Sequence, residues 1–103
     1  MKDIILIHVG DILKEEYLEP MGISAYRLAK EIGVSTSLMS QIIRGVTAIS
    51  PDTAWRLAQF FDTDVEYWLN LQLLCDMQRI NNKYAHANIT ISSYRQFYEP
   101  VEV

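Results

Sequence analysis

The segment that most constrains the fold of this chain is a short connection between two predicted helices. Residues 25–32 carry apolar side chains at i, i+3, i+4 and i+7, which predicts a helix, and Ser24 can cap its start. A second apolar stripe, within residues 38–42, begins only a few positions later, after Ser35 as its cap. Gly33 stands between the two and can adopt the left-handed conformation that ends a helix. Two helices joined by about three residues must meet at a tight corner.

Two further helices are predicted on either side of this corner. The segment GDILKEEYLEP, residues 10–20, has helical apolar spacing and should end at Pro20, because proline disfavours helical geometry in the residue before it. Ser50 then offers a cap, and Pro51 suits the first helical position, where its missing N–H is no loss. The apolar spacing of that helix predicts an end near Asp62.

The last predicted helix is long, and its start has two candidate caps, Thr63 and Asp64, between which the sequence does not decide. From Leu69 to Tyr84 its apolar residues advance in steps of four or three, so one side stays apolar over a length that exceeds the needs of a small core. Beyond Ala85 the helical period fails, and NITIS, residues 88–92, alternates like a short strand.

These elements predict an all-α fold of five helices, with short strands expected at the two termini. A chain of 103 residues fits one domain, so residues 1–103 are predicted to form a single unit. Within it, residues 8–84 are the predicted helical core, and residues 85–103 form a C-terminal extension whose structure the sequence does not define. No apolar run approaches a membrane span, and the start lacks the longer apolar region of a signal peptide, so a cytoplasmic location is expected.

The sequence contains no arrangement that predicts an enzyme, a cofactor or a metal site. His8 and His86 are isolated, and Cys75 has no partner at metal-ligand spacing. No glycine-rich phosphate loop follows a predicted strand, and the adjacent carboxylates Glu15 and Glu16 point to different faces of their helix. Cys75 lies in an apolar run, which favours a buried structural thiol over a reactive one.

The charge distribution separates the middle of the chain from its ends. The net charge is −4 and the pI is near 5.0, which argues against a surface that binds polyanions throughout. Residues 1–20 and 51–103 each have a net charge of −3, whereas residues 21–50 have +2. Composition alone does not distinguish this pattern from chance in a short chain. The positively charged residues 21–50 nevertheless contain the tight corner at Gly33.

The polar residues of the helix after the corner avoid its apolar stripe, so they occupy the opposite side. Short hydroxyls let a helix enter the major groove, glutamine can pair with adenine, and arginine can bind guanine or phosphate. A solvated helix face is the alternative, and the tight corner favours a helix-turn-helix that reads DNA. The candidate DNA-binding residues are Ser35, Thr36, Ser37, Ser40, Gln41 and Arg44, with Arg27 and Lys30 as nearby cations and Arg56 as a further candidate.

The chain resembles the helix-turn-helix repressors of the XRE type and, within them, the HigA antitoxins. The resemblance rests on HVGDILKEEYLEPMGISAYRLAKEIGVSTSLMSQIIRG and ISPDTAWRLAQFFDTDVEYWLNLQ, which lie within residues 8–72. It implies a lambda-repressor-like domain in which Ala29 lets the two helices cross closely and Gly33 forms the turn. It also implies that Met39 and Ile42 belong to the core of the reading helix.

The same resemblance implies two partners. HigA proteins commonly bind the double-stranded operator DNA of their own operon as homodimers, and they neutralise a basic RelE-like ribonuclease toxin, HigB. This chain departs from the usual pattern at Val9 and Val65, where the family usually has proline, and neither position lies on the reading helix. The apolar start MKDIILI and the tail from about Ala85 do not match the family pattern.

Two other functions stay open. The first is a stand-alone repressor of the same fold without a toxin, and the second is a helix-turn-helix used only as a protein interaction module, which the acidic pI favours. The apolar ends also have two interpretations: they pair with each other as strands, or one of them adds to the edge of a toxin's sheet.

Overall fold

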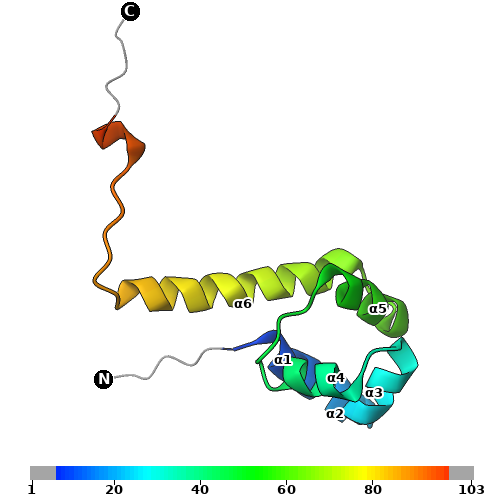
Figure 1. The fold of residues 1–103 in the computed structure, drawn as a ribbon. Coiled ribbons are helices and arrows are strands. Elements are labelled where there is room, and N and C mark those ends of the chain that lie inside the picture. Colours follow the sequence, from blue (N-terminus) through cyan, green and yellow to red (C-terminus); the bar gives the residue numbers. More distant parts are fainter. Residues whose placement is uncertain (1–6, 98–103) are drawn as a thin grey trace, which may run out of the picture.

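The predicted series of helices is present in the computed structural model, which describes residues 7–97 (Figure 1). The first three elements run on without a break, so residues 7–97 form five helices, as predicted, followed by a short 3₁₀ turn. The elements are α1 (Val9–Ile12), the π-helical turn η1 (Leu13–Leu18), α2 (Glu19–Met21), α3 (Ala25–Ile32), α4 (Thr36–Ile43), α5 (Pro51–Phe61), α6 (Val65–Ala85) and the 3₁₀ turn η2 (Tyr94–Gln96).

The all-α class is confirmed, but the strand predicted for residues 88–92 is wrong. No strand occurs within residues 7–97, and residues 88–93 follow an irregular path. Alternation of apolar residues produces a strand only where a second strand pairs with its backbone, and none lies beside this segment among the described residues. The strand expected at the N-terminus falls on residues 1–6, which, like residues 98–103, lie outside the described part of the chain.

The first helix continues through Pro20 and ends at Gly22, so the predicted end at the proline is wrong. In η1 the amide of Glu19 donates to the carbonyl of Lys14, five residues back instead of four. This wider turn gives the proline ring room, and water can replace the hydrogen bond that proline lacks because this part of the helix is exposed. Gly22 ends the helix with a φ of +66°.

Local capping follows the sequence at the next three helices. Ser24, Ser35 and Ser50 each accept a hydrogen bond from the backbone amide three residues further on, at 3.0 to 3.2 Å. Gly33 ends α3 in the left-handed conformation, with φ +76°, and Asp62 ends α5 with φ 56°. The predicted boundaries of α3, α4 and α5 are therefore confirmed.

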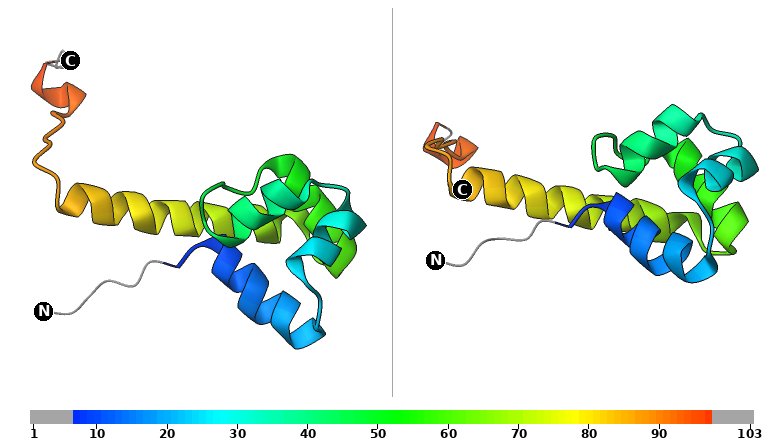
Figure 2. Two further views of the ribbon diagram at one scale, coloured as in Figure 1. Left: turned by 60° about the horizontal axis from the view of Figure 1, so that its bottom comes forward. Right: turned by 90° about the horizontal axis from the view of Figure 1, so that it is seen from below.

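The structure decides between the two candidate caps of α6. Asp64 occupies the cap position, while the Thr63 hydroxyl accepts a hydrogen bond from the indole Nε1 of Trp68 at 2.8 Å. Trp68 is the one residue of α6 that is fully buried. The C-terminal half of α6 projects away from the other helices, as Figures 1 and 2 show from three directions. The predicted long helix is confirmed, and most of its apolar side lies outside the core.

An aromatic cluster joins the start of α6 to the first helix. The Tyr17 ring lies 4.8 Å from that of Phe61 and 5.1 Å from that of Trp68, and its hydroxyl donates to the Tyr67 hydroxyl at 2.9 Å. Burial, followed by this hydrogen bond, raises the pKa of Tyr17 to about 12. The cluster therefore favours a protonated tyrosine in the folded state.

The core lies between the first helix, α3, α4, α5 and the start of α6. Gly10 lies so close to the end of α4 that an added Cβ would collide with the carbonyls of Ile42 and Ile43. Only glycine permits this approach. Cys75 packs against the core but is only half-buried, so the thiol is less buried than its apolar run suggests. Its partial burial raises the pKa of the thiol.

None of the helices within residues 7–97 is both long enough and apolar enough to cross a membrane.

Candidate nucleic-acid interface

The corner between α3 and α4 has the tight geometry that the sequence predicts. The amides of Gly33 and Val34 both donate to the carbonyl of Ala29 at 3.0 Å, which closes the end of α3. Ala29, whose carbonyl accepts both of these bonds, has no exposed surface. The chain then enters α4 directly through the Ser35 cap. These contacts hold α4 at a fixed angle to α3.

The two faces of α4 differ as predicted. Met39 and Ile42 are buried, with 0% and 1% exposure, and Leu38 is half-buried against the core. The opposite side is polar and open to solvent, which gives the helix a surface that can approach another molecule. Its exposed members are Ser35, Thr36, Ser37, Ser40 and Arg44.

Gln41 differs from the other residues of this polar face because it is half-buried. Its Oε1 accepts a hydrogen bond from the hydroxyl of Thr47 at 2.8 Å, and its backbone carbonyl accepts from the amide of Val46 at 2.8 Å. Gln41 therefore lies on the polar side of α4 but is partly covered by the loop that follows the helix. The loop after α4 folds back on the helix, and the bond from Thr47 uses one of the two acceptor positions of the Gln41 oxygen.

The cations of the candidate interface have different surroundings. Arg27 forms an ion pair with Glu31 at 2.6 Å on the exposed side of α3, and the Lys30 ammonium lies 5.4 Å from the centre of the Tyr26 ring. Arg44 is exposed at the end of α4 and, among residues 7–97, forms no ion pair. Arg44 and Lys30 are therefore the cations most available to a polyanion.

Arg56 is half-buried, and two of its N–H groups are bound by protein groups. Its Nε donates to Asp52 at 2.9 Å, and its Nη1 donates to the carbonyl of Ile32 at 2.8 Å. The sequence offers Arg56 as one more cation for phosphate, but the structure engages two of its N–H groups elsewhere. No local sequence signal could show this, because the contact with Ile32 spans 24 positions.

His8, just before α1, packs against Gly45 at the end of α4. Gly45 adopts a φ of +76° as the residue that follows the helix end, in agreement with its predicted role as a stop. The His8 ring packs against it so closely that a Cβ on Gly45 would stand 2.6 Å from a ring carbon. His8 also contacts Asp11 through its amide and its Nε2, both at 3.3 Å. The structure thus places His8 in a structural contact.

No group of three or more His, Cys, Asp or Glu side chains within the described residues can hold a metal ion. The described residues also line several surface grooves. One of about 360 Å³ lies between His8, the loop after α4, and Gln72 and Arg79 of α6. Gln72 is engaged in that position, because it accepts from the Ile49 amide and donates to Asp76, each at 2.9 Å.

The sequence and fold of this chain are similar to those of known helix-turn-helix proteins. The helix-turn-helix family model HTH_3 matches residues 14–68, slightly more than half of the chain. Among curated proteins, the virulence-associated protein I of Dichelobacter nodosus is 45% identical over 85 residues, which are 82% of this chain and 79% of that protein.

Two solved structures share both the fold and the sequence pattern. One is the antitoxin GraA, with a TM-score of 0.76 and 38% identity over 81% of this chain and 89% of that one. The other is the Pseudomonas aeruginosa antitoxin HigA with the higBA promoter. It has a TM-score of 0.69 and 36% identity over 84% of this chain and 97% of that one.

Proposed function

Because the chain belongs to the helix-turn-helix family, whose members are DNA-binding regulators and antitoxins and not enzymes, we propose that it is a sequence-specific DNA-binding antitoxin. In this proposal the homodimer represses its own operon, and the same protein neutralises a RelE-like or HigB-like ribonuclease toxin in the cytoplasm. The observation that best supports DNA binding is the exposed polar side of α4 next to the closed corner at Gly33. The operator-bound relatives support the DNA partner.

The reading surface is proposed to enter the major groove. Thr36, Ser37 and Ser40 are short, so they let the α4 backbone approach the bases closely, and Arg44 can donate two hydrogen bonds to guanine or bind phosphate. The Gln41 carboxamide keeps its nitrogen available while its oxygen is bound to Thr47. Arg27 and Lys30 on α3 are proposed as backbone contacts, which fix the orientation of the protein but carry little sequence information.

The homodimer is proposed to form through the projecting half of α6. Four apolar residues on one side of this helix, Leu73, Met77, Ile80 and Tyr84, are between 42% and 56% exposed. A helix side of this kind is stabilised when another apolar surface covers it, and a second copy of α6 fits because two-fold interfaces are self-complementary. Such a dimer must place its two reading helices about 34 Å apart to bind successive turns of DNA.

The toxin is proposed to bind the ends of the chain. Residues 51–103 have a net charge of −3, which attracts a basic partner by complementary potential. In the tail, Ile89, Ile91, Tyr94 and Phe97 are 58% to 86% exposed, so this segment offers apolar side chains outside the core. An unpaired segment with these side chains is suited to pack along a toxin's surface or to add to the edge of its sheet.

Two experiments test the proposal. The protein is titrated against DNA from upstream of its own gene, and tight binding that a scrambled fragment does not reproduce is expected. The chain is also expressed with each adjacent small open reading frame, and one of them is expected to arrest growth when expressed alone and to co-purify with this protein. DNA binding without any toxic neighbour would leave a stand-alone repressor, and the absence of specific DNA binding at low salt would favour a protein interaction module.

Truncation separates the two activities. Removal of residues 1–7, or of everything after Ala87, is expected to weaken the toxin complex far more than operator binding, because neither segment belongs to the helix-turn-helix. Equal losses of both activities in a folded truncation would contradict the proposed toxin site.

A further inference from the structure

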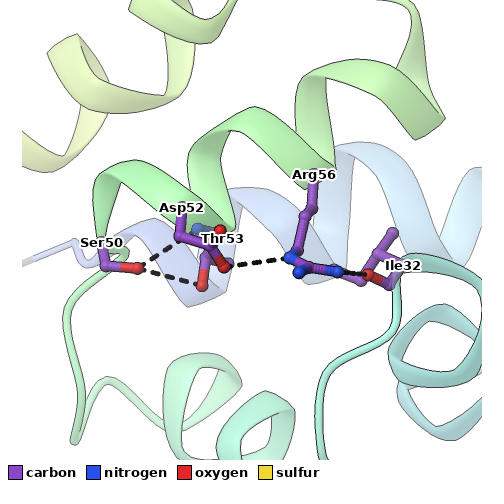
Figure 3. A network of polar contacts seen from close by, with 5 residues as sticks. All are labelled: Ile32, Ser50, Asp52, Thr53 and Arg56. Carbon is purple, nitrogen blue, oxygen red and sulfur yellow. Dashed lines mark hydrogen bonds and ion pairs between the residues drawn. The ribbon is translucent and has the colours of Figure 1, made fainter.

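A polar network on α5 reaches across to the end of α3 (Figure 3). The Arg56 guanidinium lies between Asp52, four residues earlier on its own helix, and the backbone carbonyl of Ile32. Thr53 is almost fully buried at 3% exposure, and its amide and hydroxyl both lie 3.2 Å from the Ser50 hydroxyl oxygen. The start of α5 is thereby fixed, and Arg56 extends from a well-anchored helix.

The carbonyl that Arg56 binds belongs to the corner that precedes the reading helix. The last carbonyls of an α-helix have no partner within the helix, and Ile32 is the last residue of α3. A Cβ added to Gly33, the next residue, would stand 3.0 Å from the Arg56 Nη1. The guanidinium therefore lies directly on the left-handed turn that sets the direction from α3 into α4.

A phosphate contact is the competing role for this arginine. Asp52 lies 2.9 Å from the guanidinium and offsets its charge, while a second N–H is used by Ile32. A phosphate at the same position would meet the Asp52 carboxylate, which is 74% exposed. Both facts favour a structural contact over a DNA contact.

We infer that Arg56 is a positioning residue: it fastens the α3–α4 corner to α5 and so fixes the orientation of the reading helix without touching DNA. The inference rests on the proposed DNA-binding function. Only arginine suits the role, because its planar fork binds a carboxylate and a carbonyl at the same time, whereas a lysine ammonium is a single point donor.

The test compares Arg56→Met and Arg56→Lys with the wild type and with Arg79→Met as the matched control. Arg79 also pairs with an aspartate at 2.9 Å, but on α6, away from the corner, so its removal changes the charge equally. Operator affinity and its salt dependence are measured for each full-length protein. Hydrogen exchange at the Gly33 and Val34 amides is followed in the same samples.

Arg56→Met is expected to lose roughly tenfold in operator affinity, the order expected for one charged hydrogen bond. Its salt dependence should stay that of the wild type, and exchange at Gly33 and Val34 should accelerate, with neither effect in Arg79→Met. Arg56→Lys should stay closer to Arg56→Met than to the wild type. If Arg56→Met does not fold, Arg56→Lys carries the same comparison.

Three results overturn the inference. Affinity restored by lysine, together with a shallower salt slope in Arg56→Met, identifies a phosphate contact. Exchange at the corner that does not change in either variant shows that Arg56 does not hold it. Operator affinity of both Arg56 variants equal to that of Arg79→Met is the third such result. A wild-type protein that binds no upstream DNA is a different outcome, because it refutes the proposed function itself.

Discussion

Alanine substitutions at two left-handed glycines measure how much the Arg56 contact stabilises the corner. Gly22 and Gly33 have φ values of +66° and +76°, so alanine is strained at both. A Cβ at Gly22 meets no atom within 4 Å, whereas one at Gly33 stands 3.0 Å from the Arg56 Nη1. Gly22→Ala therefore reports backbone strain alone, and Gly33→Ala reports the same strain plus displacement of the guanidinium.

The magnitudes follow from these two terms. Left-handed strain costs about 1 to 2 kcal/mol at either site, which lowers Tm by roughly 5 to 10 °C in a domain of this size. At Gly33 the guanidinium can move away, but only by weakening its bond to the Ile32 carbonyl, 2.8 Å long. Gly33→Ala should therefore cost about 0.5 to 1.5 kcal/mol more than Gly22→Ala, the net contribution of one hydrogen bond.

The assay is urea and thermal unfolding of both variants in the wild-type and Arg56→Met backgrounds. The excess cost at Gly33 should disappear in the Arg56→Met background, because the contact is then already lost. Equal costs at the two glycines in the wild type, or an excess that persists without Arg56, would refute this reasoning.

Four further outcomes are expected. Arg44→Ala and Gln41→Ala should each weaken operator binding by about 1 to 3 kcal/mol. Tm should stay nearly unchanged in Arg44→Ala and fall slightly in Gln41→Ala, which loses the hydrogen bond from Thr47. Titration and thermal melts check both variants, and unchanged affinity would reject α4 as the helix that reads DNA. With about six phosphates neutralised per dimer by Arg27, Lys30 and Arg44, log K should fall with log salt at a slope near −5, and a slope near zero would contradict the model. Met77→Glu should convert the dimer to a monomer in light scattering while Gln78→Glu, on the same exposed helix, does not; a monomeric wild type would reject the α6 interface. Because the pKa of Tyr17 is raised in the folded state to about 12, the Tyr17 hydroxyl contributes fully to stability below the ordinary pKa of 10.0, and this contribution is lost as pH rises towards 12. Tyr17→Phe should remove this alkaline loss of stability in urea unfolding. A variant with the same pH profile as the wild type would disprove the role of Tyr17.

The sequence by itself determined the features that depend on a few neighbouring residues. Serine caps bind an amide three residues away, and glycine is needed wherever the backbone takes a left-handed turn, so Ser24, Ser35 and Gly33 could be assigned from local chemistry. The two faces of α4 follow from helical periodicity in the same way. The helix-turn-helix and its exposed polar side were therefore predictable without coordinates.

Only the tertiary structure decided the contacts that join residues distant in the sequence. The hydrogen bond from Arg56 to Ile32 spans 24 positions, and the need for glycine at position 10 arises from carbonyls of α4. Whether alternating residues 88–92 form a strand depends on a pairing partner, which periodicity does not report. Pro20 is tolerated because η1 widens the helix before it and this part of the helix is exposed to water. Such contacts have no sequence signature. The charge and shape of a side chain determine which groups it can bind, but tertiary packing determines which of those groups lies close enough to be bound.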